Sequence, residues 1–175
     1  FEGNMIVMVN VIAEIGINFG GNIKVARNLI LQASRSGCWG VKFQFRNVDT
    51  FYFVDNEIGD AMIKSEITKN HLTFSQIDEL HGYSNELGLE FGMSFFRKED
   101  LSFYLNNTGD PDFYKVPSAE CMNVSLVDAL LQRGKKVLIS TGGHTIESIM
   151  DQYVSDKYKD IVILHCIANY PADLG

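Results

Sequence analysis

Short apolar segments alternate with helical segments six times along this 175-residue sequence, and the alternation limits the fold more than any other feature. The helical segments repeat apolar residues every three or four positions, as Ile23, Ala26 and Ile30 do. Strands that alternate with helices pair in parallel, because each helix carries the chain back to the start of the next strand. We expect strands at residues 6–13, 41–45, 89–94, 112–116, 136–140 and 161–165.

Helix boundary signals support the same division. Asn22 is a typical N-cap, and Thr73-Phe74-Ser75-Gln76 fits a capping box. Gly37, Gly88 and Gly134 follow periodic segments and are typical helix stops. We expect helices at residues 22–36, 74–87, 98–105, 123–131 and 146–153, whereas residues 47–72 show no clear period and predict a long loop.

Two architectures fit this order of elements, an open doubly wound sheet and a closed eight-stranded β/α barrel. A barrel needs roughly 200 residues or more, so residues 1–175 would provide six of its eight strands. Six strands alone would leave two unpaired edges and an uncovered interior, which favours aggregation. We therefore expect the chain to be a fragment of a longer protein.

Composition excludes several classes of protein. The sequence is 46% hydrophobic, and its 22 acidic against 15 basic residues give a net charge of −7 without any Lys/Arg cluster, which argues against a nucleic-acid partner. The absence of an apolar run of about 18 residues and of a secretory leader predicts neither a membrane span nor a signal peptide, and hence a cytoplasmic protein. The three cysteines, without a CxxC pair, suggest neither a disulfide framework nor a zinc site.

Polar side chains gather at one end of the predicted strands. In the segment 41–45, Val41 and Phe43 fall on one face of the strand, and Lys42 and Gln44 on the other. The corresponding polar residues of the six strands, in chain order, are Glu14, Lys42, Gln44, Ser94, Lys115, Ser118, Ser140, Thr141 and His165. Carboxyl ends of parallel strands meet at one edge, where ligands bind in such folds.

The residue types at this edge suit an anion. Lysines, serine hydroxyls and the amides of a Gly142-Gly143 turn before a helix can together hold an oxyanion or a phosphate. Glu14 and Glu120 would supply carboxylates for proton transfer or for binding sugar hydroxyls. The sequence therefore predicts a phosphate-binding site with two carboxylates beside it.

Each residue also has a simpler interpretation. Lys42 could lie on a solvated strand face, the serines could be helix caps, and Glu14 could be an ion-pair partner of Lys42. His165 is expected to be a hydrogen-bonded core histidine, because no second ligand lies at a suitable spacing, and His144 a solvent-facing turn residue. These interpretations do not explain why the polar positions share one edge.

Five segments together resemble the N-acetylneuraminate (sialic acid) synthase family. In chain order they are Ala13-Glu14-Ile15-Gly16-Ile17-Asn18, Val41-Lys42-Phe43-Gln44, Tyr114-Lys115-Val116-Pro117-Ser118, Ile139-Ser140-Thr141-Gly142, and Leu164-His165-Cys166 with Tyr170-Pro171. The resemblance implies an α/β fold, a parallel (β/α)8 TIM barrel, of which residues 1–175 are the N-terminal part, truncated after about six strands. The remaining strands and the small antifreeze-like domain of the family would lie outside this chain.

The resemblance also implies an activity. Family members condense phosphoenolpyruvate with an N-acylmannosamine or a related amino sugar, which yields a nonulosonic acid and phosphate. A divalent metal, manganese or magnesium, assists, and its histidine ligands would lie on strands after residue 175. A full-length protein of this family would be a homodimer.

By position, the family's phosphoenolpyruvate-binding residues fall on Lys42, Gln44, Ser94, Lys115, Ser118 and Ser140. Its acidic positions near the sugar and the attacking water fall on Glu14 and Glu120, which are thus the expected catalytic residues.

Three positions depart from the family pattern. Phe19-Gly20-Gly21 replaces His-Asn-Gly, Met93-Ser94-Phe95-Phe96 replaces Ser-Thr-Pro-Phe, and Ala168 stands where a hydroxyl or amide residue is usual. These departures leave the acceptor sugar open. They also motivate two alternatives: a non-catalytic remnant that binds a phosphorylated ligand or a protein partner, and a related synthase that uses a different aldose.

Overall fold

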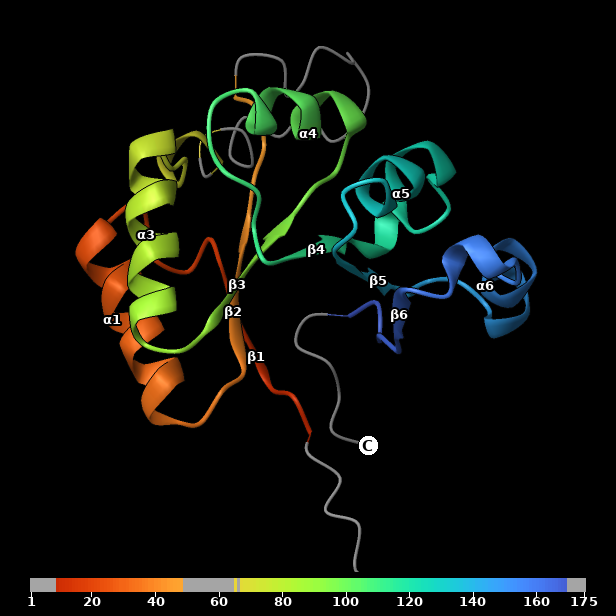
Figure 1. Cartoon of the computed structure of the whole chain (residues 1–175), viewed down its shortest axis with the longest axis horizontal. Helices are drawn as coiled ribbons and strands as arrows, with labels where there is room; N and C mark the ends of the chain where they lie inside the picture. The colour runs from red at the N-terminus through yellow and green to blue at the C-terminus, as the bar shows by residue number, and fades with distance from the viewer. Residues whose placement is uncertain (1–8, 49–64, 66, 170–175) are drawn as a thin grey trace, which may run out of the picture.

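The six strands form one parallel sheet in the order β1-β2-β3-β4-β5-β6 (Figure 1). The structure, a computed structural model, describes residues 9–48, 65 and 67–169. Each strand pairs with its neighbours in sequence, as in a β/α barrel, whereas the strand order of a doubly wound sheet reverses at a switch point. The strands are β1 Ile12–Gly16, β2 Gly40–Gln44, β3 Glu90–Ser94, β4 Phe113–Val116, β5 Lys136–Ser140 and β6 Ile161–Leu164. The sheet is a partial barrel, which the described residues do not close.

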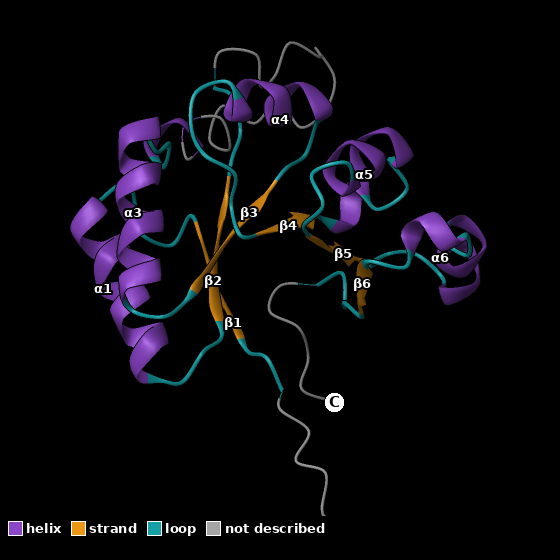
Figure 2. Cartoon of the chain, viewed as in Figure 1, coloured by secondary structure: helices purple, strands orange, loops and turns teal. Residues whose placement is uncertain are grey.

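Helices cover the outer side of the curved sheet (Figure 2). They are α1 Ile23–Arg35, α3 Phe74–Glu86, α4 Lys98–Leu105, α5 Val124–Leu131 and α6 Ile146–Gln152, with short 3₁₀ helices at Ser118–Glu120 and Asp156–Tyr158. Outward side chains such as Val41, Phe43 and Phe91 are fully buried in the core between sheet and helices. Lys42, Gln44 and Ser94 alternate with these core residues and therefore belong to the inner face.

The predicted helix ends are confirmed. The Asn22 side chain accepts hydrogen bonds from the backbone N–H groups of Lys24 and Val25, at 3.0 and 3.4 Å. Thr73 and Gln76 form the expected capping box. Gly37 and Gly88 adopt left-handed φ values of 75° and 72°, which glycine tolerates at a helix end.

The first strand lies further along the chain than predicted. β1 covers residues 12–16, not 6–13, and residues 6–8 lie outside the described part of the chain. Pairing with β2 decides this, because Ile12 aligns with Gly40, while Val9 and Val11 are 78% and 52% exposed. Glu14 is therefore inside β1 rather than after it. An apolar run alone does not locate a strand whose limits are set by its partner.

Most of the expected loop lies outside the described residues. Residues 67–69 are helical, and positions 49–64 and 66 are not described. Cys38, Cys121 and Cys166 are free thiols, as expected, but only Cys121 is fully buried. Among the described residues, none of the helices combines the length and apolar character needed to cross a membrane.

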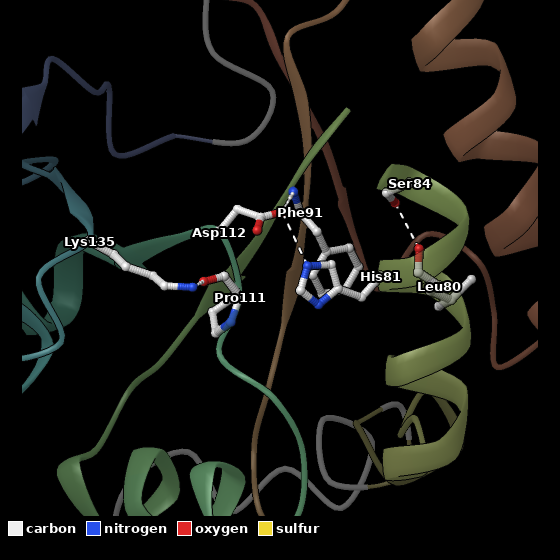
Figure 3. A network of polar contacts seen from close by, with 7 residues as sticks. All are labelled: Leu80, His81, Ser84, Phe91, Pro111, Asp112 and Lys135. Carbon is white, nitrogen blue, oxygen red and sulfur yellow. Dashed lines mark hydrogen bonds and ion pairs between the residues drawn. The ribbon is translucent and has the colours of Figure 1, made fainter. Parts of the chain in front are cut away.

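A polar network fastens helix α3 to the amino-terminal ends of the strands (Figure 3). Asp112 accepts a hydrogen bond from the Phe91 backbone N–H at 2.8 Å and lies 3.2 Å from Nε2 of His81, whose ring stacks on the Phe91 ring. Lys135 donates to the Pro111 carbonyl at 2.6 Å. This end is opposite to the polar carboxyl ends, so the network serves the scaffold.

An aromatic ring fills the inner face near the amino-terminal ends of the strands. Phe113 is fully buried and packs beside Trp39, with ring centroids 5.2 Å apart. Its ring lies over Gly92 and approaches Gly40, and these positions lack the Cβ atoms that would collide with it. The two glycines thus allow a large ring to close the inner face below the polar residues.

Replacing Gly92 with alanine is expected to destabilise the fold, because the new Cβ would overlap the Phe113 ring. Overpacking of this kind costs about 1–3 kcal/mol, and sometimes more. Urea unfolding measures the loss. Gly109→Ala is the matched control, because a Cβ there meets no atom within 4 Å. Equal stability of the two variants would contradict the assignment of Phe113 as a close-packed plug.

Candidate active site

Lys42 is the centre of a polar group on the inner face. Its side chain is 5% exposed, and its Nζ lies 2.6 Å from Oε2 of Glu14. The same ammonium donates to the Ser94 hydroxyl at 2.5 Å and to the Phe43 carbonyl at 3.3 Å. Three acceptors surround the buried cation, which offsets the loss of its hydration. The ion-pair interpretation of Glu14 is therefore confirmed, while the catalytic role expected for Glu14 stays a prediction.

Strand register explains how these residues meet. Glu14 aligns with Lys42 across β1 and β2, and Gln44 aligns with Ser94 across β2 and β3. The Lys42 side chain leans along its strand to reach the hydroxyl of Ser94 in the next inward-facing layer. Lys115 on β4 aligns with Ser94 on β3 and therefore belongs to the same layer.

An irregularity in β1 opens space beside Glu14. The register shifts between Glu14 and Gly16, and Gly16 has a left-handed φ of 53°. A Cβ at Gly16 would lie 3.0 Å from Oε1 of Glu14 and 3.2 Å from Nε2 of Gln44. Glycine at this position therefore leaves a carboxylate and an amide facing a common gap, and the half-exposed Glu14 carboxylate remains open to solvent.

Electrostatics link the two lysines. Burial lowers the pKa of Lys42 from its ordinary value to about 8, against the opposing attraction of Glu14, and the charge of Lys115 lowers it further. Burial also lowers the pKa of Lys115, while Glu14 and Cys166 act to raise it. The Glu14 carboxylate thus partly compensates the buried Lys42 and the partly buried Lys115, and an incoming anion would stabilise both ammonium groups.

The predicted glycine turn lies after β5. The Gly142 backbone N–H donates to the Ser118 hydroxyl at 3.0 Å, which joins the ends of β4 and β5. Thr141 donates through its hydroxyl to the Leu164 carbonyl at 3.0 Å and so fastens β6. Cys166 and Ala168 both border Gly142. Ser118 is therefore part of a turn at the carboxyl ends of three strands, rather than a helix cap.

Two predicted residues stand apart from the Lys42 group. Ser140 is the last residue of β5 and is 6% exposed. Glu120 accepts a hydrogen bond at 2.9 Å from the Asn123 side chain, in the turn that begins α5. Nothing among the described contacts joins Glu120 to Lys42 or Lys115, so the catalytic role expected for it stays a prediction.

The structure corrects one interpretation and explains one departure from the family pattern. His165 is exposed, and not a core histidine, because it follows the edge strand β6. His144 is exposed in its turn, as expected. Phe19 is 2% exposed and packs on Phe43 at a ring separation of 6.0 Å. The Phe19 substitution therefore fills the outer core instead of presenting a group to the site.

Sequence reasoning missed two residues near the site. Gly16 is required by the irregular register of β1, and Cys166 acts to raise the pKa of Lys115. Strand alternation does place Arg46 on the same face as Lys42 and Gln44, and the structure shows its guanidinium stacked on the Phe96 ring.

Comparison of the chain with models of protein families agrees with the family motifs. A model of the NeuB family matches residues 29–175. The chain belongs to the NeuB family. The described structure thus shows an α/β NeuB fold with six of the barrel strands, and the family resemblance of the sequence motifs is confirmed.

Relatives of this NeuB chain include synthases of several sialic acid-like sugars. It is 29% identical to an N-acetylneuraminate-9-phosphate synthase of Drosophila melanogaster, with 98% of this chain and 49% of that protein covered. It is 28% identical to an N,N'-diacetyllegionaminic acid synthase of Legionella pneumophila, covering 93% of this chain and 49% of that protein. The chain spans about half the length of these relatives.

A solved structure shares the fold. The N-acetylneuraminic acid synthetase of Leptospira borgpetersenii superposes with a TM-score of 0.80 at 22% identity, over 96% of this chain and 57% of that one. The superposition supports the assignment of the six strands to a TIM-barrel-like sheet.

A divalent metal does not fit the part of the NeuB chain that the structure describes. No group of three or more His, Cys, Asp or Glu side chains there is arranged to hold a metal ion. Glu14 is engaged with Lys42, and His165 lies on the exposed edge.

Proposed function

We propose that the full-length protein condenses phosphoenolpyruvate with an N-acylmannosamine-type amino sugar, giving a sialic acid-like nonulosonic acid and phosphate. The observation that carries this proposal is the position of Lys42 and Lys115 in adjacent layers of the inner face, with Glu14 acting on both. One buried and one partly buried ammonium group suit a ligand with two anionic groups, and phosphoenolpyruvate carries a carboxylate and a phosphate.

The residues divide into two groups. Lys42, with Ser94 and Gln44 beside it, would hold the carboxylate end of phosphoenolpyruvate, while Lys115, Ser118 and Ser140 would hold the phosphate. Positioned charges of this kind act most strongly where water is excluded, and Lys42, Ser94 and Ser140 are nearly fully buried.

The reaction then follows from the chemistry of an enol phosphate. C3 of phosphoenolpyruvate attacks the aldehyde carbon of the sugar, and the aldehyde oxygen takes a proton. Water adds to the cationic C2 centre and loses a proton. The bond from C2 to the phosphate oxygen then breaks and the C2 hydroxyl loses its remaining proton, which leaves a ketone at C2 and releases phosphate. Glu14 is proposed for proton transfer, because its half-exposed side chain faces the gap at Gly16. Glu120 is proposed to assist the attacking water.

Phosphate release tests the proposal. The full-length protein would be supplied with phosphoenolpyruvate, Mn²⁺ and either N-acetylmannosamine or its bacterial diamino analogues. Product formation supports the synthase. If no phosphate is released with any of these acceptor sugars, the synthase proposal is wrong.

A non-catalytic ligand-binding remnant is the second candidate. Ala168 favours it, because this exposed residue borders Gly142 and provides no hydrogen-bonding group to the turn. Calorimetric measurement of phosphoenolpyruvate binding distinguishes a ligand-binding protein, whether synthase or remnant, from a remnant that binds only a protein partner. Phosphoenolpyruvate binding that disappears in Lys42→Met and Lys115→Met identifies a ligand cradle, and no binding in the unmodified protein favours a remnant that contacts a protein partner.

Ala168→Thr is expected to tighten phosphoenolpyruvate binding about 3- to 10-fold. A hydroxyl beside Gly142 would add one hydrogen bond to the phosphate, which contributes about 0.5–1.5 kcal/mol. Ala168→Val is the matched control, since it adds the same bulk without a hydroxyl. Calorimetric titration compares the three proteins, and an equal gain from valine would refute the hydrogen-bond explanation.

Three further expectations belong to this proposal. A divalent cation, manganese or magnesium, would support the reaction from ligands outside the described residues. The full-length protein would be a homodimer. It would act in the cytoplasm.

A further inference from the structure

A cleft of about 390 Å³ opens at the amino-terminal ends of β5 and β6. One wall is the connection from α5 to β5, and the other is the connection from the 3₁₀ helix Asp156–Tyr158 to β6. The two strands are hydrogen-bonded neighbours, so the cleft lies between paired elements and not on the free edge of β6. Its volume is in the range of small-molecule sites in proteins.

Strand β5 separates this cleft from the predicted phosphoenolpyruvate site. Lys136 begins the strand and lines the cleft, whereas Ser140 ends the strand on the side of the Lys42 group. Four residues of extended chain span about 13 Å. A phosphate group that contacts Ser140 therefore cannot also contact the cleft, which is a second place for a ligand.

Lysines dominate the charge of the cleft, whose charged lining residues are Lys135, Lys136, Lys159 and Asp160. Three ammonium groups against one carboxylate leave two positive charges, in a chain whose net charge is −7. Among the residues that the structure describes, none of the three lysines forms an ion pair. The basic residues next to them are paired, Arg133 with Asp110 at 2.9 Å and Lys157 with Asp128 at 3.2 Å. The cleft thus keeps an uncompensated positive charge.

Two of the three ammonium groups are held in position. Lys135 donates to the Pro111 carbonyl at 2.6 Å (Figure 3), which uses one of its three N–H bonds and leaves two for a ligand. Nζ of Lys136 lies 5.3 Å from the centroid of the Trp39 ring. Side chains that are already ordered lose less conformational entropy when they bind.

The remaining lining of the cleft is largely apolar. Leu131 and Ile161 are partly buried, and Val162 is 39% exposed. A phosphate monoester carries a charge of about −1.5 to −2 at pH 7, which matches the two positive charges. Its organic part would find an apolar surface beside them. Inorganic phosphate would use only the lysines.

We propose that this cleft binds a small organic phosphate, with Lys135 and Lys159 on the phosphate group and with Leu131, Ile161 and Val162 against the organic part. None of these residues belongs to the predicted phosphoenolpyruvate site. The cleft therefore holds its ligand whether or not the full-length protein is a synthase.

Phenyl phosphate and inorganic phosphate are the probes, titrated into the full-length protein. Trp39 is the only tryptophan in residues 1–175 and contacts Lys136, so its emission reports on the cleft. The change that disappears in Trp39→Phe is the signal. Phenyl phosphate is expected to bind about fivefold more tightly than inorganic phosphate, as burial of roughly 40 Å² of its ring would give.

Lys159→Glu is expected to weaken phenyl phosphate binding about 10-fold, because one attraction becomes a repulsion, and Lys135→Met about 3-fold. Lys157→Met is the matched control, since Lys157 is two residues from Lys159 but is paired with Asp128. It should leave the affinity unchanged.

Four results would overturn the proposal. They are an unchanged affinity in Lys159→Glu, an equal loss in Lys157→Met, equal affinities for the two probes, and a Trp39 signal that is absent in the unmodified protein. Loss of binding in Lys42→Met but not in Lys159→Glu would place the probe in the predicted phosphoenolpyruvate site, and would overturn it as well.

Discussion

Lys42→Met is expected to weaken phosphoenolpyruvate binding about 10- to 100-fold at pH 7.5. Methionine matches the length of lysine without its charge, so the substitution removes an ammonium that hydrogen-bonds its ligand, a contribution of about 1.5–3 kcal/mol. The substitution also removes the ammonium that lies 2.6 Å from the Glu14 carboxylate, so that this carboxylate repels an incoming anion. Calorimetric titration of the full-length protein measures the change.

Two further variants isolate the cause. Lys136→Met is the matched control. Lys136 also belongs to the inner face, but it is exposed at the amino-terminal end of β5, with its Nζ 5.3 Å from the Trp39 ring centroid. It should leave binding unchanged. Glu14→Gln combined with Lys42→Met should recover part of the loss by removing the repulsion. An unchanged affinity in Lys42→Met would exclude Lys42 from the ligand site.

Much of the architecture could be predicted because it depends on local signals. Asn22, Thr73 and the helix-ending glycines act within one turn of the chain, and the structure confirms all of them. The alternation of Val41, Lys42, Phe43 and Gln44 likewise assigned each side chain to a face without knowledge of the partner strands. Strand order was different, since a doubly wound sheet and a barrel use the same local pattern, and only the family resemblance favoured the barrel.

The remaining differences come from contacts between distant residues. The limits of β1 depend on pairing with Gly40. The need for glycine at position 92 is explained only by Phe113, 21 positions later, whose ring lies over it. Sequence placed Glu14 and Lys42 at one edge, but the 2.6 Å contact requires a register that alternation does not specify. Glu120 was expected near the site from its position in the family, and its observed contact is with Asn123 in a local turn, so its role stays a prediction.

Phosphoenolpyruvate affinity is expected to fall as the pH rises through about 8. The ligand stays fully ionised over this range, since the second pKa of a phosphate ester is about 6. The pKa of Lys42 in the free protein is lowered to about 8, so above that pH most molecules must take up a proton before they can bind an anion. Affinity should decrease about tenfold per pH unit for one such proton. The lowered pKa of Lys115 would make the decrease steeper.

Glu14→Gln is expected to move this transition to lower pH. The charge of Glu14 and its hydrogen bond both raise the pKa of Lys42 against the effect of burial, so a neutral amide leaves burial less opposed. Affinities are compared by calorimetry between pH 6.5 and 9.5. Glu120→Gln is the control, because Glu120 contacts Asn123 and is absent from the groups that act on Lys42. A transition at the same pH in Glu14→Gln, or an affinity that rises with pH, would show that a charged Lys42 is not what the ligand requires.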